Sequence, residues 1–370
     1  MSTTETASVT LHGECAPRFA AVREALAENF TARDEIGSAV CVYKNGVKVV
    51  DLWGGHMDTA RHIPWQDDTL CIIYSISKSM CALCIHILAD RGLIDLEAPV
   101  ATYWPEFAQN GKAAVKVRHV ISHNCGVCFA DAAKPDDIFH WNAMIRALEV
   151  QEPAWPPETK GAYNTVNIGY LAGELVRRVA GQRIQDFLHE NVCKPLGAEL
   201  YLGVPEDALG RCADLTPNPA GNALAKAGSN PDSPVARAWK PMAIDKNQNS
   251  TRFRTAGIPS FGGFAEIDGV RLLSPEAIQR ATVTQWASEA NAMTGLPMAM
   301  AMGFWKNMPS FSPLGDSPDA FGHLGSGGAR AFADPGRGLA VGYVTNFQTE
   351  GAGTGVRVEA VVDAIMGCAG

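Results

Sequence analysis

The chain has 370 residues, of which 46% are apolar and 19% charged, so it is long enough to bury a large core and too apolar to be disordered throughout. It carries 31 Lys and Arg against 39 Asp and Glu, a net charge of −8, with no run of basic residues that would follow a phosphate backbone. Composition therefore predicts a globular protein of roughly two to three domains that does not bind nucleic acid.

The N-terminus and the cysteines indicate a compartment. The first ten residues have neither a basic nor an apolar segment, which predicts no signal peptide and a cytoplasmic protein. The longest apolar run, 81–89, is far too short to cross a bilayer, so no contact with a membrane is expected. Two CxxC pairs have the spacing of zinc ligands, but the first lies in a helical pattern. We interpret both pairs, Cys81/Cys84 and Cys125/Cys128, as packing thiols and predict no metal and no organic cofactor.

The N-terminal part predicts a helix followed by a hairpin. Apolar residues recur every three or four positions over 15–30, which is the period of an amphipathic helix. Two β-rich runs within 38–55 flank Lys44-Asn45-Gly46, and Asn-Gly between apolar runs is a strong signal for a hairpin turn.

Helical patterns dominate the middle of the chain. They cover 77–91, 113–122, 167–180 and 184–191. A stretch rich in Pro, Asn and Gly, 203–250, interrupts them and predicts loops.

The C-terminal part returns to strands. Residues 329–333 and 339–346 flank an Asp-Pro-Gly-Arg-Gly turn, and the chain ends in a helical pattern with one apolar face. We therefore predict one antiparallel sheet built from both chain ends, with a helical domain inserted between them. Residues 1–68 and 256–370 would form the sheet domain, and residues 69–255 the helical domain.

The sequence Ser-Ile-Ser-Lys opens the first helical pattern of the middle region. Its spacing places Ser75 and Lys78 on one face of a helix, at the N-terminus. A serine hydroxyl becomes a nucleophile when a base lies beside it, and a lysine supplies that base once burial lowers its pKa. The free N–H groups at the helix start favour an oxyanion. Ser-x-x-Lys also occurs by chance, and Ser75 could equally be a plain N-cap.

Two further segments favour catalysis. Tyr-Asn-Thr at 163–165 precedes a helical pattern, and His-Leu-Gly-Ser-Gly at 323–327 precedes the C-terminal hairpin. In this order the three motifs make the chain resemble the penicillin-recognising serine hydrolases: class C β-lactamases, DD-peptidases and family VIII carboxylesterases. The resemblance runs over about residues 35–365. It implies an α/β fold of the β-lactamase/DD-peptidase type, an antiparallel sheet flanked by helices with an inserted helical domain.

The resemblance also implies roles for individual residues. Ser75 resembles the acylated nucleophile, and Lys78 and Tyr163 the pair that moves its proton; which of the two is the base stays open. The backbone N–H groups of Ser75 and Ser326 would form the oxyanion hole. His323 stands where relatives carry the lysine of Lys-Thr-Gly, so a fixed cation for a penicillin carboxylate is missing.

Four residues are expected to contact substrate: Asn164, Gly325, Trp305 and Phe321. Asn164 comes one position before the asparagine of the family's Tyr-x-Asn motif, which disfavours recognition of a β-lactam amide. Trp305 and Phe321 flank the motifs and would wall an acyl pocket. His123 is interpreted as a hydrogen-bonded structural histidine rather than a catalytic one.

We therefore predict a serine hydrolase that cleaves carboxylic esters through a covalent acyl-enzyme on Ser75. A β-lactamase, an amidase or D-aminopeptidase, or an acyltransferase at the same site are alternatives. A catalytically silent scaffold is another, because the span 256–272 is short where relatives carry an extra helix. The expected partners are a small-molecule ester or amide and, as an option, further copies of the same chain in a homo-oligomer.

Overall fold

A computed structural model describes residues 9–242, 244–245, 247–265, 273–351 and 354–370. Most of the second half of the short 256–272 span, residues 266–272, lies outside the described residues, so the expected loss of a helix there stays a prediction.

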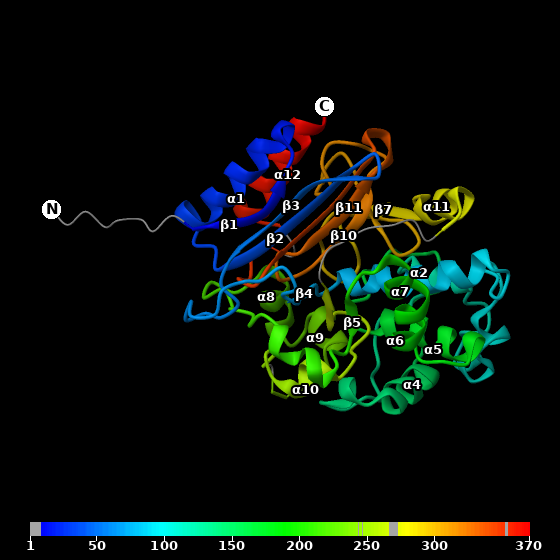
Figure 1. The fold of residues 1–370 in the computed structure, drawn as a ribbon. Helices are drawn as coiled ribbons and strands as arrows, with labels where there is room; N and C mark the ends of the chain where they lie inside the picture. The colour runs from blue at the N-terminus through cyan, green and yellow to red at the C-terminus, as the bar shows by residue number, and fades with distance from the viewer. Residues whose placement is uncertain (1–8, 243, 246, 266–272, 352–353) are drawn as a thin grey trace.

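Strands from both ends of the chain form one large sheet, as predicted (Figure 1). Within the described residues it has nine strands in the order β1-β3-β2-β12-β11-β10-β9-β8-β7, and all its pairs are antiparallel. Its strands are β1 (Leu11–Cys15), β2 (Gly37–Lys44), β3 (Val47–Gly55), β7 (Trp286–Ser288), β8 (Met298–Met300), β9 (Trp305–Lys306), β10 (Phe321–Leu324), β11 (Arg330–Asp334) and β12 (Leu339–Thr345). The N-terminal and C-terminal parts meet where β12 pairs with β2, Val341 opposite Val42.

A second, small sheet joins distant parts of the chain. In the described structure it has the order β4-β6-β5. Its strands are β4 (Cys71–Ile72), β5 (Leu200–Leu202) and β6 (Gly263–Ala265). Strand β6 thus pairs with strands of the middle region although residue 256 was the predicted start of the sheet domain. The division of the chain into two domains stays a prediction.

Both predicted hairpins are confirmed. Strands β2 and β3 are joined through Asn45 and Gly46, whose φ angles of 52° and 80° are those of a type I′ turn. Strands β11 and β12 are joined by a short 3₁₀ turn, Pro335–Arg337, which Gly338 ends with a φ of 60°.

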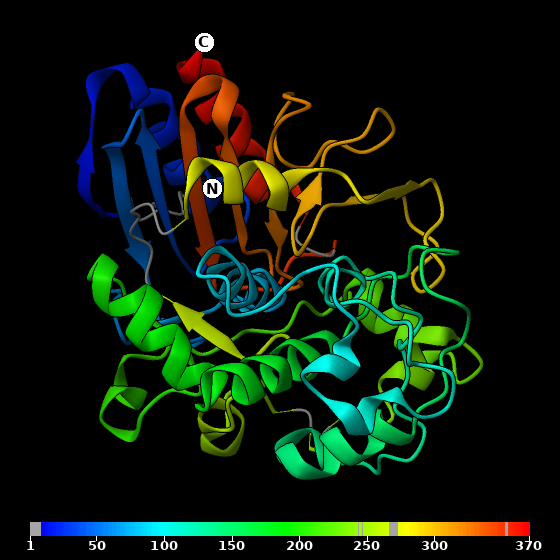
Figure 2. The same cartoon turned by 90° about the vertical axis from the view of Figure 1, so that its right-hand side faces the viewer.

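Helices cover the large sheet on both faces (Figure 1). The described helices are α1 (Ala20–Ala32), α2 (Ile76–Asp90), α3 (Val117–Ile121), α4 (Trp141–Val150), α5 (Asn167–Ala180), α6 (Ile184–Leu188), α7 (Lys194–Leu196), α8 (Ala223–Ser229), α9 (Pro234–Ala238), α10 (Thr251–Thr255), α11 (Pro275–Thr282) and α12 (Val356–Ala369). Helices α1 and α12 lie together on one face, where Val22, Leu26, Val361 and Ile365 enter one buried cluster. On the other face α2 lies next to the sheet, and α5 and α6 pack against α2, as Figure 2 shows. The apolar face predicted for the last helix is therefore the face it buries.

Three predicted helices differ in extent. The helix expected over 15–30 begins at Ala20, after β1 and a 3₁₀ turn over Pro17–Phe19, and ends at Ala32. The helix expected over 113–122 begins only at Val117. Before it the chain makes a turn, in which Val115 N–H donates to Lys112 O at 3.0 Å, and Lys116 N–H is capped by His119 Nδ1 at 3.1 Å. The pattern over 184–191 forms α6 and then continues through a π-helical turn, His189–Cys193, into α7. No helix in the described ranges is both long and apolar enough to span a membrane.

Candidate active site

The predicted nucleophile lies at the corner between β4 and α2. Tyr74 turns the chain with a φ of 47°, a left-handed conformation that a non-glycine residue adopts only where its surroundings fix it. Ser75 is the N-cap of α2, and its side chain caps no backbone N–H, so the hydroxyl is available for chemistry. Ser77 ties this first turn to β6, because its Oγ accepts from Gly263 N–H at 3.0 Å.

Lys78 reaches back to Ser75 from one turn along α2. Its Nζ lies 2.9 Å from Ser75 Oγ and 2.8 Å from Ser260 O, and the side chain is 1% exposed. Burial removes water from the ammonium group and lowers the pKa of Lys78 to about 7. In the described part of the chain no carboxylate forms an ion pair with it, so nothing opposes that shift strongly. Near neutral pH a substantial fraction of Lys78 is therefore a free amine beside the hydroxyl.

Tyr163 lies close to both Lys78 and Ser75. Lys78 Nζ is 5.3 Å from the centre of the Tyr163 ring, and Tyr163 shares a side-chain hydrogen bond with Ser75. Burial raises the pKa of Tyr163 well above its usual value, and that hydrogen bond opposes the rise. Tyr163 is consequently a phenol at neutral pH, able to donate a proton but not to act as a phenolate. Of the two groups, Lys78 has the pKa of a base.

His323 is buried beside Tyr163, with 5.9 Å between the ring centres. Its Nδ1 lies 2.8 Å from Leu324 O, and a carbonyl only accepts, so Nδ1 carries the proton and Nε2 an unshared electron pair. Burial and the charge of Lys78 lower the pKa of His323 to about 3. His323 is thus a neutral hydrogen-bond acceptor at any working pH, which strengthens the expectation that no fixed cation stands here.

His123 packs on the other face of Tyr163, at 5.0 Å between ring centres. Its Nδ1 accepts a hydrogen bond from Asn164 N–H at 2.8 Å, so Nε2 carries the proton. The interpretation of His123 as a hydrogen-bonded histidine is confirmed, and its contact with the ring gives it the further task of holding Tyr163.

Two residues of different elements line one cavity, Ser75 at the start of α2 and Ser326 in the turn between β10 and β11. Within the described residues the backbone N–H of neither donates to another backbone group. Two glycines let this turn approach the corner. A Cβ on Gly325 would lie 2.5 Å from Ile73 O, and one on Gly327 would lie 2.5 Å from the Tyr74 ring. The pair of free amides is the arrangement of an oxyanion hole.

A cavity of about 480 Å³ opens onto Ser75 and Ser326. Most of its walls are apolar, and six large aliphatic and aromatic side chains contribute to them: Leu224, Trp239, Met242, Ile244, Phe253 and Phe261. Lys240 also lines it, but its Nζ donates to Asp131 O. The cavity therefore suits an apolar group attached to a carbonyl carbon at Ser75.

The four predicted substrate contacts lie in different places. Asn164 uses its whole amide on the protein, since Nδ2 donates to Val127 O at 2.9 Å and Oδ1 accepts from Asn167 N–H at 2.8 Å. Gly325 gives the turn its close approach to β4. Trp305 is buried against Tyr163 and His323, and Phe321 lines a different cavity, between the sheet and α2. A direct contact of any of the four with substrate stays a prediction, and the observed packing does not favour it for Asn164 or Phe321.

The structure brings four residues to the site that the sequence did not single out: Thr165, Asn222, Gln248 and Ser260. Thr165 Oγ1 is buried at the cavity and has no partner in the described structure. It stands two positions after Tyr163, where the family's asparagine would be, so the motif contained the signal. Asn222 Nδ2 lies 3.2 Å from Ser326 Oγ, Gln248 accepts from Tyr74 OH, and Ser260 accepts from Lys78. Asn222, Gln248 and Ser260 come from segments far from the motifs in sequence, and no sequence motif marks them as site residues.

The described residues contain no group of three or more His, Cys, Asp or Glu side chains placed to hold a metal ion. The four cysteines of the CxxC pairs are all buried. Burial raises the pKa of Cys81 to about 12 and that of Cys125 to about 11, which keeps both as thiols.

Comparison with known proteins places this geometry in a family. The family model described as Beta-lactamase matches residues 22–364. The esterase/beta-lactamase LipL of Mycobacterium tuberculosis is 33% identical over 359 residues, which cover 90% of this chain and 82% of LipL.

Two solved structures share the fold along nearly the whole chain. One is a penicillin-binding protein homologue from Caulobacter crescentus and the other a family VIII carboxylesterase. Each has a TM-score of 0.86 and 33% identity, and each match covers 97% of this chain and 100% of the other.

Proposed function

Because this chain belongs to the Beta-lactamase family, we propose that it is a serine hydrolase that cleaves carboxylic esters through a covalent acyl-enzyme on Ser75. One observation carries the proposal: the buried Lys78 Nζ, 2.9 Å from Ser75 Oγ, whose pKa of about 7 makes it a base at neutral pH. The named functions of its relatives, an esterase/beta-lactamase and a carboxylesterase, support the same chemistry.

Acylation begins with the ester carbonyl carbon above Ser75 and its oxygen between the amides of Ser75 and Ser326. Neutral Lys78 takes the proton from Ser75 Oγ as the new C–O bond forms, and the two amides stabilise the charge on the carbonyl oxygen. The C–O bond to the alcohol then breaks, and the phenol of Tyr163 donates a proton to the departing oxygen. Lys78 restores the proton of Tyr163, so the acyl-enzyme forms with the amine neutral again.

Deacylation repeats these steps with water in place of the serine. Water needs a proton acceptor as it attacks, and the neutral amine of Lys78 accepts that proton. The acid leaves when Ser75 Oγ regains its proton from Lys78. No step requires a metal or an organic cofactor.

An ester of a neutral, mainly apolar acid is the substrate class that the site fits best. The larger part of the cavity wall beside Ser75 is apolar, and the residue at the place of the family's lysine, His323, is uncharged. The ten cysteines are all described, and all are thiols, which supports a reducing compartment, and we propose the cytoplasm.

The test is labelling of the nucleophile. A fluorophosphonate probe should label the wild-type protein on Ser75. Ser75→Ala should abolish this labelling and lower the rate of ester hydrolysis at least about a thousandfold, while its melting temperature stays within a few degrees of the wild-type value. The matched control is Ser79→Ala, one turn further along α2, where the hydroxyl donates to Gly303 O at 2.8 Å, and it should keep the label. A wild-type protein that neither labels nor hydrolyses p-nitrophenyl esters is the silent scaffold, and the proposal is then wrong.

A further inference from the structure

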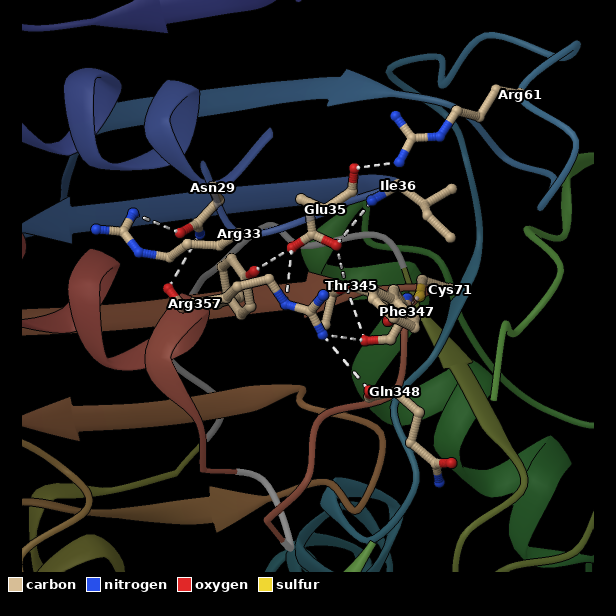
Figure 3. A network of polar contacts seen from close by, with 11 residues as sticks. Asn29, Arg33, Glu35, Ile36, Arg61, Cys71, Thr345, Phe347, Gln348 and Arg357 are labelled. Carbon is tan, nitrogen blue, oxygen red and sulfur yellow. Dashed lines mark hydrogen bonds and ion pairs between the residues drawn. The ribbon is translucent and has the colours of Figure 1, made fainter. Parts of the chain in front are cut away.

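A buried ionic network joins Glu35, Thr345 and Arg357 (Figure 3). At its centre Glu35, between α1 and β2, accepts from Tyr343 OH at 2.8 Å, from Thr345 Oγ1 at 2.7 Å and from Ile36 N–H at 3.1 Å. Arg357 Nε lies 3.8 Å from the same carboxylate. Three neutral donors and one cation oppose the effect of burial, which still leaves the pKa of Glu35 above its usual value.

Arg357 also holds the main chain beyond the end of β12. Its Nη2 donates to Phe347 O at 2.7 Å and lies 3.5 Å from Gln348 O, and the guanidinium lies 4.4 Å from the centre of the Phe347 ring (Figure 3). We call residues 346–350 the connector. The strand ladder with β2 ends at Thr345. Beyond it the connector is held by backbone pairing with Thr216, whose N–H donates to Asn346 O at 2.7 Å and whose O accepts from Gln348 N–H at 2.9 Å, and Arg357 adds its contacts to Phe347 and Gln348.

On its other side the connector contacts the active site. Thr349 N–H donates to Gly327 O at 3.2 Å, which fixes the turn that presents the Ser326 amide. Ala223 N–H donates to Glu350 O at 3.0 Å, at the start of α8, whose cap Asn222 contacts Ser326. The connector therefore links the buried network to the oxyanion turn through two hydrogen-bonded routes.

We infer that Arg357, held by Glu35, is a positioning residue for the Ser326 amide of the oxyanion hole. The inference rests on the proposed function, because it assigns the network to the same reaction. An oxyanion-hole donor contributes only when it meets the developing charge at hydrogen-bonding distance, and complete loss of one such donor lowers kcat by about a hundred- to a thousandfold. A small displacement of the turn should cost part of that factor and leave ground-state binding in the cavity almost unchanged.

The test compares Arg357→Met and Glu35→Gln with the wild-type protein. We expect kcat for a p-nitrophenyl ester to fall about tenfold in each, with KM within about twofold. Affinity for phenylboronic acid, which forms a tetrahedral adduct on the serine and places an oxygen in the hole, should fall by a similar factor. Arg357→Lys keeps one donor for Phe347 O and should recover a large part of both losses.

A buried carboxylate in the helical region supplies matched controls. Glu174 is also fully buried and is paired with Arg178 at 2.7 Å on α5, remote from the connector. Glu174→Gln and Arg178→Met should lower the melting temperature as much as the test variants do, yet leave kcat and phenylboronic acid affinity within twofold. Comparing the two pairs of variants separates displacement of the Ser326 amide from a general loss of folding stability.

The inference is wrong if Arg357→Met and Glu35→Gln lower only the melting temperature and keep kcat and boronic acid affinity within twofold. Should Arg357→Met fail to fold, Arg357→Lys and Glu35→Gln decide the matter by the same criterion. Failure of the proposed function has a different signature, because the wild-type protein itself would then neither hydrolyse the ester nor bind phenylboronic acid.

Discussion

The two amides of the proposed oxyanion hole come from regions that are held in different ways. The corner before α2 continues into a regular helix: Lys78 N–H donates to Ser75 O at 3.0 Å, and Cys81, Cys84 and Ile85 bury the helix in the main core. Contacts of Ser77 with Gly263 and of Lys78 with Ser260 add to this local support. The turn between β10 and β11 is fixed from outside, by the connector, by Asn222 and by the close approach of Gly325 to Ile73. The nucleophile therefore belongs to a rigid element, whereas the second amide depends on several distant contacts.

Removal of the base from the rigid corner should have the largest effect after loss of the nucleophile. Lys78→Met should lower kcat/KM for p-nitrophenyl acetate by about 10²- to 10⁴-fold, the contribution of a general base. In the wild-type protein the active form is the neutral amine, so kcat/KM should rise with pH through an apparent pKa of about 7 and become constant above about pH 8.

Lys78→Arg is the control for charge and size. A guanidinium stays protonated, so this variant should be as inactive as Lys78→Met and should show no rise between pH 6 and 8. A wild-type profile that is flat over that range would contradict the assignment of Lys78 as the base. His323 cannot produce the rise, because its pKa of about 3 lies below the range.

The difference between the two regions also explains what the sequence could predict. The corner is local: Ser75 and Lys78 are three residues apart, and helical periodicity was enough to place both side chains on one face. The order of the motifs and the strands at both chain ends predicted the sheet. The surroundings of the turn are not local, because Asn222 and the connector reach it from segments about 100 and about 20 residues away, and no periodicity records such contacts.

Asn164 shows the same limit at a single residue. Its identity suggested a ligand for the substrate, but its amide is satisfied by Val127 O and by Asn167 N–H, which only the folded loop brings near. The next residue of the motif is Thr165. Within the described structure its hydroxyl lines the cavity and has no hydrogen-bond partner.

The selectivity between esters and β-lactams tests the role of His323, which lies on β10. A neutral His323 cannot form a charge-assisted hydrogen bond with a β-lactam carboxylate, and such a bond is worth about 1.5–3 kcal/mol, or roughly ten- to a hundredfold in binding. Asn164 supplies no free amide for the lactam side chain either. We expect kcat/KM for a short-chain p-nitrophenyl ester to exceed that for nitrocefin by at least about a hundredfold at pH 8.

His323→Lys should narrow that gap by improving nitrocefin more than the ester. The new ammonium would lie near Lys78, and like charges lower one another's lysine pKa values, so the rise of the pH profile should move below pH 7. A wild-type enzyme that hydrolyses nitrocefin as efficiently as the ester, or a lysine variant with an unchanged ratio, would contradict this prediction.

Changes in the turn itself should have intermediate effects. A Cβ at Gly325 meets the backbone oxygen of Ile73, whereas one at Gly327 meets the Tyr74 ring, each at 2.5 Å. A backbone atom cannot move aside as a side chain can, so Gly325→Ala should lower kcat by about ten- to a hundredfold and Gly327→Ala by less. Gly210→Ala, where the added carbon meets no atom within 4 Å, is the control and should retain full activity. Equal activity of all three variants would show that the turn tolerates displacement.

The smallest effect is expected from removal of metal ions. Cys81 and Cys84 lie on α2, the helix that carries Lys78. If they bound a zinc ion, a chelator that removed it would disturb the helix and lower the activity. Both thiols are buried in the main core, and burial raises the pKa of each, so they pack as small apolar side chains rather than as thiolate ligands. We therefore expect excess EDTA to leave kcat, KM and the melting temperature unchanged. Cys84→Ala, which deletes one supposed ligand, should likewise keep its activity and lose only the stability of a buried side chain. Stoichiometric zinc in protein purified without a metal column, lost together with activity on chelation, would contradict the packing role and tie the nucleophile corner to a metal.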